Sequence, residues 1–115
     1  MSDAIAYKVL TASEWARFEA DGVFTGAPVD VADGFIHLST AAQITETVDK
    51  HFAGASGLWV AAIDLTALGQ AVKWEPSRGG ALFPHVYAPL PMAAVVASAP
   101  LTRDATGAVV VPGER

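Results

Sequence analysis

Hydrophobic and polar positions in the first part of the chain predict a strand followed by a helix. Residues 5–10 are rich in β-forming side chains and indicate a short strand. Thr11 and Glu14 then have the spacing of a capping box, in which each side chain bonds the backbone N–H of the other residue. Gly22 is a good residue to end a helix. We therefore expect a helix over about residues 12–20.

A second strand and helix are predicted after a turn at residues 33–34. Residues 35–39 alternate, with Ile36 and Leu38 on one face of the expected strand and the other three side chains on the opposite face. Thr40 and Gln43 fit another capping box, and an apolar stripe at helical spacing runs on to Phe52. The second helix should therefore begin at Thr40 and close near residue 54.

Short strands dominate the second half of the chain. Residues 58–63 are apolar on both faces, which is typical of a central strand covered on both sides. One helical turn at 65–68 precedes further strands that we expect at residues 72–74, 83–87, 93–98 and 108–111. Helices that alternate with strands only in the first half favour an α+β fold with two helices. Its 115 residues suit a single domain, 1–115.

Composition narrows the classes of function. Hydrophobic residues make up 52% and charged residues 17%, which excludes a disordered chain. No apolar run approaches the roughly 18–20 residues of a membrane span, and the first residues lack the pattern of a signal peptide, so we expect a cytoplasmic protein. A net charge of −5 argues against nucleic acid as a partner. The chain has no cysteine, and its three histidines lack metal-ligand spacing, so no metal is expected.

His37 and Ser39 form the first candidate site, on the same strand face as Phe35. An imidazole there could bond a ribose or phosphate, or act as an acid or base near neutral pH. The simpler interpretation is a half-buried histidine bonded to a backbone carbonyl, with Ser39 capping the next helix. Asp33 lies close by, and an Asx turn is its favoured role.

His85 and Tyr87 repeat this geometry beside Phe83. Such a face could stack a base or a nicotinamide ring and bond its edges. The simpler interpretation is two amphipathic side chains at the rim of the core, with their polar ends in water.

The segment KWEPSRGG at residues 73–80 is the third candidate. Arg78 beside two glycines can present a guanidinium and backbone amides to an anion. Glu75 could polarise a hydroxyl or stabilise a developing cation, and Trp74 is a further candidate ligand contact. Alternatively, Glu75 and Arg78 pair with each other across the turn.

These segments together resemble a known bacterial family. The segments are DGFIHLST at residues 33–40, KWEPSRGG at 73–80 and LFPHVYAPL at 82–90, preceded by the helix start at residues 10–15. They resemble the "domain of unknown function 952" family over about residues 7–101, with Ala88 where that family has glycine. This family is in turn distantly similar to the ADP-ribosyltransferase-like superfamily, particularly to RNA 2′-phosphotransferases. The resemblance implies a split or strongly bent mixed β-sheet with a nucleotide cleft.

The resemblance also implies a function and roles for the candidate residues. The cleft would bind NAD or a related small-molecule nucleotide and transfer or hydrolyse ADP-ribose. The catalytic residues would be His37, which holds the ribose or phosphate, and Glu75, which stabilises the ribosyl cation. The ligand-binding residues would be Phe35, Ser39, Trp74, Arg78, His85 and Tyr87. The alternative is a non-catalytic ligand-binding or protein-interaction module, which is favoured by a first strand that has only Lys8 where related enzymes carry His or Arg.

Overall fold

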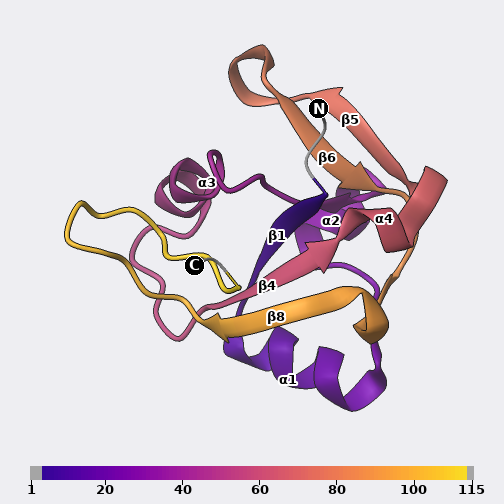
Figure 1. The fold of residues 1–115 in the computed structure, drawn as a ribbon, viewed down its shortest axis with the longest axis horizontal. Coiled ribbons are helices and arrows are strands. Elements are labelled where there is room, and N and C mark those ends of the chain that lie inside the picture. The colour runs from indigo at the N-terminus through magenta and orange to yellow at the C-terminus, as the bar shows by residue number, and fades with distance from the viewer. Residues whose placement is uncertain (1–3, 114–115) are drawn as a thin grey trace.

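The computed structural model describes residues 4–113 of the chain. Its first sheet has three antiparallel strands (Figure 1). Their order is β1 (Ile5–Leu10), β4 (Trp59–Asp64) and β8 (Val95–Pro100), with the apolar strand β4 in the centre. The prediction of a central strand at this place is therefore confirmed. Burial on both faces explains why β4 shows no alternation of apolar and polar residues.

A second sheet follows the order β3 (Ile36–His37), β6 (Leu82–Val86) and β5 (Val72–Pro76), and β2 (Val23–Phe24) pairs with β7 (Leu90–Pro91). Every one of these strand pairings is antiparallel, so the expected mixed sheet is wrong.

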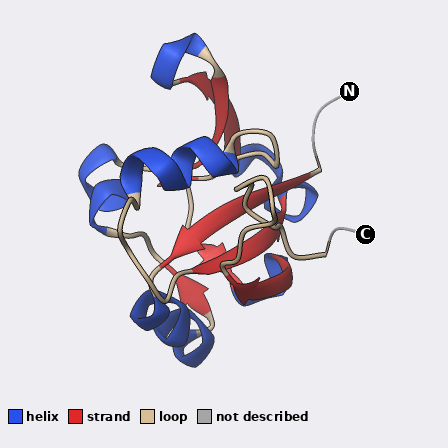
Figure 2. Cartoon of the chain, turned by 90° about the vertical axis from the view of Figure 1, so that its left-hand side faces the viewer, coloured by secondary structure: helices blue, strands red, loops and turns tan. Residues whose placement is uncertain are grey.

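One bridge joins the first two sheets: the N–H of Tyr7 donates to the carbonyl of Ser39 at 2.7 Å, and the reverse bond is 2.9 Å. The β5–β6 hairpin projects from the body of the domain (Figures 1 and 2).

Four short α-helices occur within the described residues, whereas the sequence predicts two. They are α1 (Ala12–Asp21), α2 (Pro28–Asp33), α3 (Ile44–His51) and α4 (Leu65–Leu68). The α4 turn was expected, but α2 was missed because it is only six residues long and contains two β-branched valines. Two features stabilise the start of α2 that the hydrophobic pattern does not reveal. A proline occupies its first turn, and the carboxylate of Asp30 accepts the N–H of Ala27 at 2.7 Å.

Several boundaries differ from the sequence prediction. α3 begins at Ile44 because residues 41–43 form a turn, in which the side chain of Gln43 accepts the N–H of Thr40 and donates to the carbonyl of Leu82. Residues 92–94 form a 3₁₀ turn before β8, and the expected strand at 108–111 is reduced to one bridge between Arg103 and Val109. Within residues 4–113, no helix is long and apolar enough to cross a membrane.

The first sheet separates two hydrophobic clusters. One face of β1 and β4 packs with α1 through Trp15 and Phe18, while the other face packs with α3 through Ile44 and Val48. Helices therefore lie around the outside of the strands (Figure 2). Lys8 lies between Ala6 and Leu10 on β1 and so shares their buried face, which places a cation inside the domain.

The capping box of α1 forms as the sequence predicts. The Thr11 hydroxyl accepts the N–H of Glu14 at 3.1 Å, and the Glu14 carboxylate accepts the N–H of Thr11 at 2.9 Å. Thr11→Ala should lower the free energy of unfolding by about 1 kcal/mol, because it leaves a helix N–H without its acceptor. Urea denaturation of this variant and of Thr11→Ser, which keeps the hydroxyl, measures the effect. Equal stability of both variants would contradict the prediction.

Candidate functional site

A cleft of about 490 Å³ lies beside the bridge that joins the two main sheets. Among the sequence candidates, His37, Ser39 and His85 line this cleft together with Phe83. His37 and His85 come from neighbouring strands, where they are directly opposite each other in the β3–β6 register, and their ring centroids are 5.4 Å apart. Antiparallel pairing is thus what brings these two histidines, 48 positions apart in the sequence, to one surface.

His37 lies between two carboxylates. Its Nδ1 is 2.7 Å from Asp30 Oδ1, and its Nε2 is 2.9 Å from Asp33 Oδ2. A carboxylate only accepts hydrogen bonds, so both contacts are satisfied when both ring nitrogens carry protons. The expectation that this ring bonds a backbone carbonyl is therefore wrong, and so is the Asx turn at Asp33, whose side chain reaches the ring from the last residue of α2.

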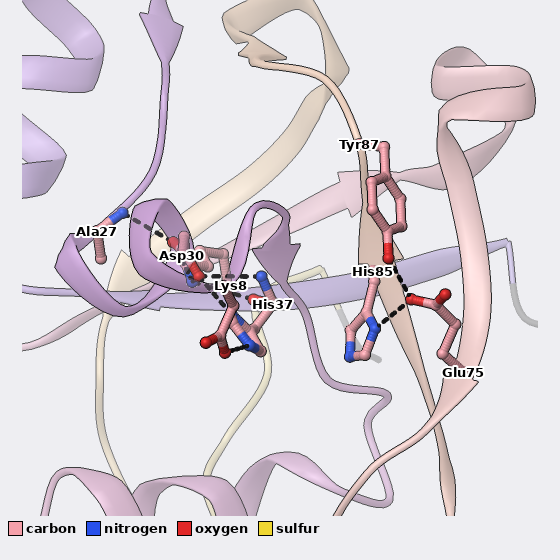
Figure 3. Close-up of polar contacts among 8 residues, drawn as sticks. Lys8, Ala27, Asp30, His37, Glu75, His85 and Tyr87 are labelled. Carbon is pink, nitrogen blue, oxygen red and sulfur yellow. Dashed lines mark hydrogen bonds and ion pairs between the residues drawn. The ribbon is translucent and has the colours of Figure 1, made fainter.

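Asp30 is the centre of a buried polar group that we call the Asp30 cluster: Lys8, Asp30, His37 and the N–H of Ala27 (Figure 3). The two carboxylate oxygens of Asp30 accept hydrogen bonds from Lys8 Nζ, from the ring and the backbone N–H of His37, and from the N–H of Ala27. Lys8 Nζ also donates to the carbonyl of His37 at 3.0 Å. Burial by itself would raise the pKa of Asp30, but the hydrogen bond from His37 and the charge of Lys8 lower it to about 2. Burial lowers the pKa of the Lys8 ammonium, and Asp30 opposes part of this change.

The second polar group, which we call the Glu75 cluster, consists of Glu75, His85 and Tyr87 (Figure 3). Glu75 Oε1 accepts the phenol hydroxyl of Tyr87 at 2.8 Å and lies 2.7 Å from Nδ1 of His85. The hydrogen bond from His85 and then that from Tyr87 lower the pKa of Glu75, and the same carboxylate raises the pKa of the Tyr87 phenol.

An ionised Glu75 requires the proton of a neutral His85 ring to lie on Nδ1, which leaves a lone pair on Nε2. The side chain of His85 is only 5% exposed, and its Nε2 has no hydrogen-bond partner among the described residues.

Phe35 packs between the two clusters. Its ring stacks on His85 at a centroid distance of 4.1 Å and lies 4.7 Å from His37 and 5.2 Å from Tyr87. Phe35 and Tyr87 line a second, smaller pocket of about 300 Å³. Phe35, which lines the smaller pocket, is therefore in ring contact with both histidines that line the main cleft.

The remaining candidates lie at the edges of this site or away from it. The Ser39 hydroxyl is buried and bonded to Thr47 at 2.9 Å. Trp74 packs against the larger hydrophobic cluster. The backbone of Arg78 lies in the 3₁₀ turn of the β5–β6 hairpin, next to Ser77 of the cleft wall, while its side chain lies outside the described part of the structure. His51 also lines the cleft.

Sequence reasoning missed Asp30 and left the direction of Lys8 open. The available signal was a lysine between two apolar positions of a strand, because a buried ammonium requires an anionic partner. The partner, Asp30, is 22 positions away on α2, a helix that the sequence does not predict. The sequence therefore could not indicate which residue pairs with Lys8.

Within the described residues, no three His, Cys, Asp or Glu side chains are grouped so that they could hold a metal ion.

Fold and site define a small α+β domain whose histidine-lined cleft lies beside the junction of two antiparallel sheets. The chain matches the family described as "Protein of unknown function (DUF952)" over residues 9–98, and it belongs to that family. The resemblance to this family, expected over about residues 7–101, is thereby confirmed over residues 9–98.

Solved structures of one bacterial relative have the same fold. The crystal structure of protein CC0527 from Caulobacter crescentus is 46% identical, with a TM-score of 0.84, and the match covers 92% of this chain and 93% of that one. Its solution NMR structure is 47% identical, with a TM-score of 0.79 and coverage of 93% and 91%. A search of curated proteins found no match.

Proposed function

We propose that the cleft binds an ADP-ribose-type nucleotide, with NAD as the leading candidate, and that the domain is ADP-ribosyltransferase-like. Two features support the proposal. The cleft lies beside the junction of two small sheets, and the His-Leu-Ser segment that carries the resemblance contributes His37 and Ser39 to its wall. At about 490 Å³ the cleft is within the usual range for small-molecule sites.

The unpartnered Nε2 of His85 is the observation that carries the proposal. A buried polar atom without a hydrogen bond costs about 1–3 kcal/mol, so a site that keeps one gains free energy when a ligand supplies the partner. Glu75 lies 2.7 Å from Nδ1, which leaves the buried Nε2 as the acceptor of this ring, and His85 is one of the residues that line the cleft. A ribose hydroxyl or a water molecule beside the ribose is a suitable donor.

The same geometry supports hydrolysis of a ribosyl–nicotinamide bond. The bond between C1′ and the ring nitrogen breaks, nicotinamide leaves with the electron pair, and a water oxygen forms the new bond to C1′. His85 Nε2 takes the proton of that water as general base. Glu75 then acts as a positioning residue, because its carboxylate orients the ring and stabilises the imidazolium that forms.

Calorimetric titration with ADP-ribose and with NAD tests the proposal. The wild type should bind both, and His85→Phe, which keeps an aromatic ring on Phe35, should bind about tenfold more weakly because one buried hydrogen bond is lost. Lys50→Ala, at an exposed position of α3, is the control and should bind like the wild type. No binding of either nucleotide to the wild type at millimolar concentration would contradict the proposal.

Chromatographic detection of free nicotinamide separates the two candidate functions. Release that depends on His85 supports the enzyme. Binding without release supports the alternative, a non-catalytic ligand-binding module.

A further inference from the structure

The two carboxylates that hold His37 differ in their surroundings. The side chain of Asp30 is 1% exposed and is bonded to Lys8, to two backbone N–H groups and to the His37 ring. The side chain of Asp33 is 47% exposed, lines the cleft and contacts Nε2 of His37 at 2.9 Å. Asp30 therefore belongs to the folded core, whereas Asp33 can turn into water without leaving a buried group unpaired.

Helix stability does not explain a carboxylate at position 33. Asp33 is the last residue of α2, where the helix dipole disfavours negative charge. It also follows Asp30 by three positions, the spacing at which two like charges on a helix repel each other. The helix is ended by Gly34, whose φ of 88° is suited to glycine and whose N–H bonds the carbonyl of Asp30. The contact that Asp33 does make is with the cleft histidine.

We propose that the Asp33 carboxylate occupies the position on His37 Nε2 that an anionic oxygen of the ligand, such as a phosphate oxygen, takes when the cleft is filled. On binding, Nε2–H exchanges one anionic acceptor for another, so His37 keeps two hydrogen bonds before and after. Asp30 holds Nδ1 throughout and fixes the ring orientation. Asp33 is then a specificity residue, because it weakens the binding of simple anions and requires that a ligand make further contacts in the cleft.

This inference rests on the proposed function, since it places the phosphate end of an ADP-ribose-type nucleotide at His37. An exposed ion pair is a weak competitor, so its removal should strengthen the binding of an anion by about three- to fivefold. The histidine itself should be indispensable for that binding.

NMR titration with inorganic pyrophosphate at constant ionic strength tests the exchange. The ring signals of His37, one of only three histidines in the chain, should shift on titration of the wild type. Asp33→Asn should bind pyrophosphate about three- to fivefold more tightly. The matched control is Asp21→Asn, which removes the same charge from an exposed position on α1 and should leave the affinity unchanged. Thermal unfolding of each variant checks the fold.

The outcomes separate this inference from the proposed function. Tighter binding by Asp33→Asn, together with shifts of the His37 ring, supports the exchange whether or not ADP-ribose binds. Equal or weaker binding by Asp33→Asn, an equal gain in Asp21→Asn, or pyrophosphate that leaves the His37 signals in place overturns it. An absence of ADP-ribose binding in the presence of this anion effect would refute the proposed nucleotide and leave the anion site standing.

Discussion

Asp30→Asn should lower the free energy of unfolding by about 3–5 kcal/mol, the usual cost of removing one partner of a buried ion pair. Lys8 would keep its ammonium in a site where it is 7% exposed, without the carboxylate that lies 2.9 Å from Nζ. His37 Nδ1 would also lose an anionic acceptor. Because small domains are stable by only about 5–15 kcal/mol, the loss should be plain in urea or thermal denaturation.

Two further variants identify the cause of that loss. Asp33→Asn, on the same helix but exposed, should change stability by less than about 1 kcal/mol. The double variant Lys8→Met/Asp30→Asn removes the buried charge and keeps the apolar stem of the side chain, so it should be more stable than Asp30→Asn alone. A double variant that is less stable than the single one would show that the unpaired ammonium is not the cause.

Acid should remove about 2 kcal/mol of stability through Asp30. Its pKa falls from 3.8 to about 2 on folding, so the unfolded chain takes up the proton first as the pH falls. The stabilisation is complete at pH values well above 3.8, decreases as the pH falls from about 5, and is lost below the folded pKa of about 2. Burial lowers the pKa of Lys8, so as the pH rises the folded state gives up this proton before the unfolded state does.

Urea denaturation between pH 7 and pH 2 measures this effect. The lowered pKa values of Glu75 and Asp104 act in the same direction, so a comparison variant is required. The wild type should lose about 2 kcal/mol more than Lys8→Met/Asp30→Asn, which retains both of those carboxylates. Parallel pH profiles for the two proteins would show that Asp30 is not the group responsible.

The two histidines of the site show which arrangements a local sequence pattern predicts and which it does not. Alternation along a strand predicts that His37 and Ser39 share a face, and both line the cleft. The same reasoning marks His85 and Tyr87 as a pair, and both bond Glu75. Neither pattern predicts the β3–β6 register that places the two histidines opposite each other, because strand pairing depends on contacts between segments that are distant in the sequence.

The sequence by itself determined the α+β class, the α1 capping box, the central position of β4 and the family, because these depend on local spacing and on motifs. Only the tertiary structure decided that Lys8 points inward, that Asp30 holds both Lys8 and His37, and that Asp33 closes on Nε2 of His37. The physical reason is burial. A buried charged group requires a partner of opposite charge or hydrogen-bonding groups close to it. Here those partners, Asp30 and Asp33, lie on the short helix α2, which the sequence pattern does not predict.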